Sequence, residues 1–118
     1  MDAAELDRKM LAEREFWVEV APGKRMKLRR PLMDEYGAYA TDSSPKHMAE
    51  CLRDWDGIVE ADLVAGGSEQ PVDYSVATAG LAMRDNIDWF KAVAKGIFEA
   101  MNARALATSI AVKNLQPS

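Results

Sequence analysis

Cysteine and histidine are almost absent from this chain of 118 residues, which contains one of each, Cys51 and His47. A single cysteine excludes an internal disulfide, so we expect side-chain packing alone to hold the fold, as suits a reducing compartment. Zinc needs about three or four ligands, and a nucleophilic triad needs a base beside its nucleophile. On the helix face that His47, Glu50, Cys51 and Asp54 would share, Cys51 belongs to the apolar stripe, and no second His or Cys exists to complete a zinc shell. The composition therefore predicts no metal site, no cofactor and no enzymatic activity.

Long apolar runs are missing as well. None approaches the ~18 to 20 residues that cross a bilayer, and residues 1–14 lack the apolar centre of a signal peptide. Hydrophobic residues make up 48% of the chain and charged residues 29%, which is typical of a folded protein and not of a disordered one. We therefore expect one cytoplasmic domain over residues 1–105, with no membrane contact, and a flexible tail over 106–118.

Apolar residues at three- and four-residue spacing predict a mainly helical protein. The expected helices cover Ala3–Glu15, Pro45–Val59, Val76–Met83 and Ile87–Ala105. Their starts follow good capping residues, with Ser44 before Pro45, Ser75 before Val76, and Asn86 before Ile87. Residues 32–40 have no clear periodicity, and either a loop or a weak helix fits them. The side chains expected to form one helical core are Leu52, Trp55, Trp89, Phe90 and Ile97.

Residues 16–30 break the helical pattern. The segments 16–20 and 24–30 each alternate with period two on either side of Ala-Pro-Gly at 21–23, which predicts a β-hairpin. The fold class is therefore a small, mainly α domain with an N-terminal hairpin, α+β at most. Because a two-stranded hairpin is only marginally stable alone, its apolar side must pack on the helices or on another chain. We expect a homo-oligomer when no other partner is present.

A three-residue loop gives this hairpin its best register. It sets Val20 opposite Met26 and Val18 opposite Leu28, so one side is apolar and the other is charge-paired. In that register Lys24 takes a left-handed conformation.

The second strand of the hairpin is strongly basic, although the whole chain has a net charge of -4. A basic ribbon beside a tryptophan could bind a nucleic-acid backbone or an acidic protein, and a solvated strand edge explains it equally well. The acidic remainder of the chain disfavours nucleic acid, because affinity there comes from neutralising several phosphates. The candidate partner-binding residues are Trp17, Arg25, Met26, Lys27, Leu28 and Arg29.

Three short motifs then follow one another along the chain: Trp-Asp-Gly-Ile at 55–58, Pro-Val-Asp-Tyr-Ser at 71–75 and Asp-Asn-Ile-Asp-Trp at 85–89. With the amphipathic helix after them, they make the segment 51–102 resemble the phage tail assembly chaperones of siphophages. The basic stretch Gly-Lys-Arg-Met-Lys-Leu-Arg-Arg-Pro at 23–31 is similar to the hairpin that often precedes this segment in such proteins.

The resemblance implies a small, mainly helical, non-enzymatic protein of the host bacterial cytoplasm. Such chaperones bind the tape measure protein, keep it soluble and assist polymerisation of the tail tube around it, so the tail tube protein is a second expected partner. The seven methionines would suit binding of variable apolar surfaces, although methionine more often fills cores. A small nucleic-acid-binding or regulatory protein that uses residues 24–30 is the alternative.

Overall fold

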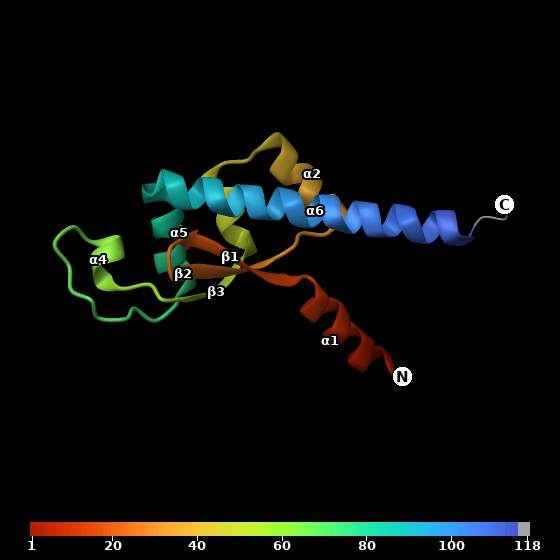
Figure 1. Cartoon of the computed structure of the whole chain (residues 1–118), viewed down its shortest axis with the longest axis horizontal. Coiled ribbons are helices and arrows are strands. Elements are labelled where there is room, and N and C mark those ends of the chain that lie inside the picture. The colour runs from red at the N-terminus through yellow and green to blue at the C-terminus, as the bar shows by residue number, and fades with distance from the viewer. Residues whose placement is uncertain (116–118) are drawn as a thin grey trace.

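Helices make up most of the structure, a computed structural model that describes the fold of residues 1–115 and the side chains of residues 1–39 and 41–110 (Figure 1). The elements in chain order are α1 (Ala3–Glu13), β1 (Glu15–Ala21), β2 (Lys24–Arg29), α2 (Met33–Thr41), α3 (Pro45–Met48), the 3-10 turn η1 (Ala49–Cys51), β3 (Leu52–Asp56), α4 (Glu60–Leu63), α5 (Val76–Asp85) and α6 (Ile87–Leu115). The prediction of a mainly α protein with an N-terminal hairpin is confirmed. Within the described residues, no helix has both the length and the apolar character needed to cross a membrane.

The hairpin forms, but its predicted register is wrong. Val18 lies opposite Met26 and Phe16 lies opposite Leu28, two positions away from the expected pairing. The ladder shifts at Val20, which lies between the paired Glu19 and Ala21 and makes a bulge next to the turn. Because a slip of two residues keeps every side chain on its face, the apolar side of the hairpin is still the predicted one.

A third strand interrupts the helix that was predicted over Pro45–Val59. The helix stops at Met48, a 3-10 turn follows, and β3 pairs antiparallel with β2 in the sheet order β1-β2-β3. Leu52 lies opposite Leu28 and Trp55 opposite Met26, so a bulge at Arg53 puts both side chains on the buried face at a spacing of three residues. A helix stripe has the same spacing, and this explains the wrong prediction.

The hydrophobic core lies between the sheet and the helices α3, α5 and α6. Its buried members include Leu52, Trp55, Trp89 and Ile97, as predicted, while Phe90 is half-buried against them. Two of these residues come from β3, so the core is not purely helical. Helix α6 approaches β1 so closely that a Cβ at Gly96 would lie 2.5 Å from a methyl group of Val18.

The apolar side of the hairpin is therefore covered by the chain's own helices. Met26 and Leu28 are completely buried, and Phe16, Val18 and Val20 pack against the core. The sheet also gains β3 along the outer edge of β2. The reason given for self-association, an uncovered hairpin face, does not hold in this structure.

Helix α6 is the longest element and runs ten residues beyond its predicted end at Ala105. No glycine or proline occurs between Leu106 and Leu115, so nothing in that stretch stops a helix. Its C-terminal half extends away from the body at the end where α1 also projects (Figure 1). The described part of the predicted tail is thus helical, its flexibility stays a prediction, and residues 116–118 lie outside the described residues.

The three sequence motifs make contacts that fix neighbouring elements of the fold. The indole Nε1 of Trp55 donates a hydrogen bond to the carbonyl oxygen of Val72 at 2.8 Å, and the Val72 amide donates to Ile58 at 2.9 Å. The Trp55 ring also meets Tyr74 edge to face, with the ring centroids 5.6 Å apart. These contacts join the first motif to the second, and Oδ1 of Asn86 caps α6 in the third. The motifs therefore position β3, the following loop and α6.

Candidate functional site

The predicted partner-binding residues of the hairpin separate onto two faces. Met26 and Leu28 lie in the core with no exposed surface, so the prediction that they contact a partner is wrong. Trp17 is 40% exposed on the opposite face. The guanidinium of Arg25 lies 4.3 Å from the centre of the Trp17 ring, and the ammonium of Lys27 lies 6.0 Å from it. These contacts make a cation–π cluster on the sheet surface.

The basic ribbon is largely matched by acidic neighbours. Nε of Arg25 lies 3.3 Å from a carboxylate oxygen of Asp56, and Nζ of Lys27 lies 3.1 Å from one of Glu15. Lys24 pairs with Asp62 at 2.7 Å between its ammonium and the carboxylate. The strand β3, absent from the sequence-based prediction, supplies Asp56. Three of the five cations in residues 24–30 are thus paired, which leaves a weak positive field for binding phosphates.

Arg29, the last of these candidates, is half-buried at the end of β2. Its Nε is buried, and the described residues supply no hydrogen-bond partner for it. Arg29 therefore contributes little to the exposed face that holds Trp17.

A larger surface feature was not predicted. A groove of about 730 Å³, here called the helix groove, lies between α1, α2 and the C-terminal half of α6. Its lining is mainly apolar, with methionine from each of the three helices. The lining residues are Met10, Glu13, Arg14, Arg30, Leu32, Met33, Tyr36, Met101, Asn102, Arg104, Ala105, Thr108 and Ser109.

The apolar walls of the helix groove are open to solvent. Met33 is 86% exposed, and Met10 and Leu32 are each about half exposed. The projecting helices expose further large apolar side chains, namely Leu6 and Leu11 on α1, and Leu106 and Ile110 on α6. Exposed apolar surface that continues over neighbouring helices is typical of a protein-binding site.

The floor of the helix groove carries three arginines. Nη2 of Arg14 lies 3.3 Å from a carboxylate oxygen of Glu35, and Nη1 of Arg104 lies 3.3 Å from one of Glu13. Arg30 forms no ion pair within the described part of the chain. Burial lowers the pKa of Arg30 below its ordinary value, and repulsion from Arg104 lowers it further, while Glu13 acts in the opposite direction. The groove thus combines apolar walls with a cation, Arg30, that forms no ion pair among the described residues.

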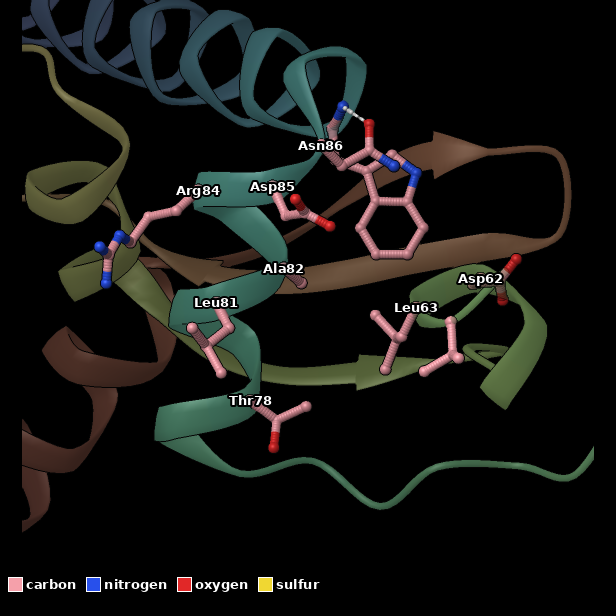
Figure 2. A pocket seen from close by; sticks show the side chains of 10 residues that line it. Asp62, Leu63, Thr78, Leu81, Ala82, Arg84, Asp85 and Asn86 are labelled. Atoms are coloured by element: carbon pink, nitrogen blue, oxygen red, sulfur yellow. Dashed lines mark hydrogen bonds between the residues drawn. The ribbon is translucent and has the colours of Figure 1, made fainter. Parts of the chain in front are cut away.

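A second cavity, of about 670 Å³, opens between α4, α5 and the start of α6. Figure 2 shows Leu63 of α4 and Leu81 of α5 on facing elements of its wall. Two of its polar groups have structural roles: Asn86 caps α6, and Asp62 accepts a hydrogen bond from the Val59 amide and pairs with Lys24. Its lining residues include no histidine, serine or cysteine that could act as a base or a nucleophile.

The chain's reactive side chains lie elsewhere and are sequestered. Cys51 is buried, and burial raises the pKa of its thiol, which keeps the thiol protonated and a weak nucleophile at neutral pH. His47 lies 3.9 Å from carboxylate oxygens of both Asp42 and Glu50. Among the described residues, no group of three or more His, Cys, Asp and Glu side chains could hold a metal ion. Asp54 belongs to β3, so the helix face considered in the sequence does not exist.

No protein-family model, curated protein sequence or solved structure matches this chain. The candidate site therefore depends on its own geometry. Sequence reasoning missed the helix groove because it gave the helix at Ala3–Glu15 no neighbour and assigned the residues beyond Ala105 to a flexible tail. The available signal was the spacing of Leu6, Met10 and Leu11, together with the absence of glycine and proline between Leu106 and Leu115.

Proposed function

We propose that this protein is a non-enzymatic phage tail assembly chaperone of the host bacterial cytoplasm. In this proposal the helix groove binds an apolar helix of the tape measure protein, and the tail tube protein is a second candidate partner. The identification of the partner comes from the resemblance of residues 51–102 and the preceding hairpin to such chaperones.

One observation carries the proposal, namely the open, methionine-rich helix groove. Amphipathic helices bind in apolar grooves through side chains one helical turn apart. Methionine is unbranched and polarizable, so Met10, Met33 and Met101 can adapt to partner side chains of different shape. A chaperone that covers a long helical partner at many places needs such tolerance. The paired cations of the hairpin weigh against the nucleic-acid alternative.

Co-expression with the tape measure protein from the same gene cluster tests the proposal. We expect the wild-type chain to keep the tape measure protein in the soluble fraction and to co-purify with it. Met33→Glu puts a charge in the groove wall at a side chain that is 86% exposed, so it should abolish co-purification while the protein stays folded. Val76→Glu is the matched control, because Val76 is 79% exposed on α5 and does not line the groove.

Two results would refute the proposal. If both variants bind the tape measure protein as well as the wild type does, the groove is not the binding site. If the neighbouring genes encode neither a tape measure protein nor a tail tube protein, the identification as a tail assembly chaperone fails. If only Val76→Glu fails to bind the tape measure protein, the binding site lies on α5 and not in the helix groove.

A further inference from the structure

Helix α1 projects from the body and buries none of its side chains (Figure 1). It has 11 residues, which is shorter than the ~12 to 15 that an isolated helix needs to be even marginally stable in water. Its apolar residues Leu6, Met10 and Leu11 are each 40% to 55% exposed. A short helix with an exposed apolar face is stabilised when another surface covers that face.

The charge of α1 indicates which surface that is. Between Asp2 and Glu13 there are four acidic and two basic residues, a net charge of -2. Asp7 precedes Met10 by three positions and Leu11 by four, so its carboxylate lies on the same side of the helix as these apolar side chains. It forms no ion pair with any residue that the structure describes.

The helix groove has the complementary composition. Its walls are apolar, and Arg30 on its floor has no carboxylate partner among the described residues. The backbone amide of Arg30 donates to the carbonyl oxygen of Arg14 at 2.7 Å, which places Arg30 beside the C-terminal end of α1. An acidic helix with an apolar face therefore matches the groove in apolar character and in charge, and α1 of another copy is such a helix.

We propose that two copies of the chain associate through the helix groove, with α1 of each copy lying antiparallel to α1 of the other and Asp7 facing Arg30 of the partner subunit. The helical rise makes this register consistent. Asp7 and Arg14 are seven residues apart, or ~10 Å along the helix axis. In an antiparallel pair of α1 helices, a two-fold axis between Met10 and Leu11 puts Asp7 of one copy opposite Arg14 of the other. Because Arg30 lies beside Arg14, Asp7 then also faces Arg30 of the partner subunit.

Such an interface is closed and self-complementary. Each copy supplies one acidic helix and one basic groove, so the two-fold axis generates two equivalent ion pairs around an apolar centre. The dimer follows from the surface of this chain alone, and in it α1 of the second copy would compete with the tape measure helix of the proposed function for the same groove.

Sedimentation velocity on the full-length chain, over a concentration series up to about 1 mM, tests the dimer, since a dissociation constant above that value corresponds to less than ~4 kcal/mol of association. We expect the wild type to dimerise. Asp7→Lys and Arg30→Glu should each raise the dissociation constant by about tenfold or more, because each puts like charges in contact twice per dimer. The double variant Asp7→Lys with Arg30→Glu should restore association.

Two matched controls carry the same charge changes elsewhere. Glu99→Lys and Lys91→Glu alter exposed positions of α6 outside the groove, and both should dimerise like the wild type. Circular dichroism on each variant distinguishes dissociation from unfolding. A monomeric wild type would overturn the proposal, as would a double variant that dissociates as much as the single variants while remaining folded. Equal weakening by the controls would show a non-specific charge effect and would also overturn it.

Discussion

Replacing Gly57 with alanine is the sharpest test of how the hairpin and β3 fit together. Gly57 has φ of +79°, in the left-handed region, and a Cβ there would press on the carbonyl oxygen of Gly23 in the hairpin turn. Gly23 and Gly66 have nearly the same φ, +75° and +78°, but a Cβ at either position would have no atom within 4 Å. Comparing the alanine variants at these three positions therefore separates the cost of the left-handed backbone from the cost of the steric contact.

The expected magnitudes differ between these positions. A left-handed conformation costs an alanine ~1 to 2 kcal/mol, and all three variants share this cost. At Gly57 the new methyl group meets backbone, which a rotamer change cannot relieve, so overpacking adds ~1 to 3 kcal/mol. We expect Gly57→Ala to lose about 2 to 5 kcal/mol, a large fraction of the ~5 to 15 kcal/mol typical of native proteins.

Urea unfolding followed by tryptophan fluorescence measures the difference. With a slope of ~1 to 3 kcal/mol per molar urea, the midpoint of Gly57→Ala should lie about 1 M below the midpoints of Gly23→Ala and Gly66→Ala. The same mutation should weaken the ion pair between Lys24 and Asp62, because Lys24 also donates to the Gly57 carbonyl oxygen at 3.1 Å. Equal midpoints for the three variants would show that Gly57 does not touch the turn and would refute the predicted contact.

Two further predictions concern the core. Trp89 is buried among core residues, so Trp89→Ala should lose ~3 to 5 kcal/mol in calorimetry or urea unfolding, and a wild-type melting temperature would contradict its burial. Burial raises the pKa of Cys51 and of Tyr39, so the folded state keeps protons that the unfolded state releases above the ordinary thiol pKa of 9.0. The free energy of unfolding should therefore fall as the pH rises from about 8 to about 10. The free energy of unfolding of Cys51→Ala should fall less over the same range. An equal fall in both proteins would exclude a role for the thiol.

The starts of α5 and α6 were predictable from the sequence, whereas the third strand was not. Ser75 and Asn86 cap α5 and α6 through hydrogen bonds to backbone amides, and these bonds depend on local residues alone. The strand β3 depends on a partner distant in the sequence. Its bulge at Arg53 changes the usual alternation into a three-residue spacing, so no local pattern separates this strand from a helix.

The candidate site was harder to predict, because exposure is a tertiary property. Met26 and Met33 are both methionines, yet the first is fully buried in the core and the second is 86% exposed. The difference arises from the path of the chain after β2, which places Met33 beyond the edge of the core. The prediction of hairpin residues as partner contacts was wrong for Met26 and Leu28 for the same reason.

The residues that support the resemblance and those that form the helix groove are largely different. The motifs at 55–58, 71–75 and 85–89 make hydrogen bonds and aromatic contacts that fix β3, the loop after it and the start of α6. The groove is lined by α1, α2 and the far end of α6, where few side chains are needed to hold the core. Mutations in the motifs should therefore act first on stability, and mutations in the groove should act on association. The two sets of variants can then be measured independently of each other.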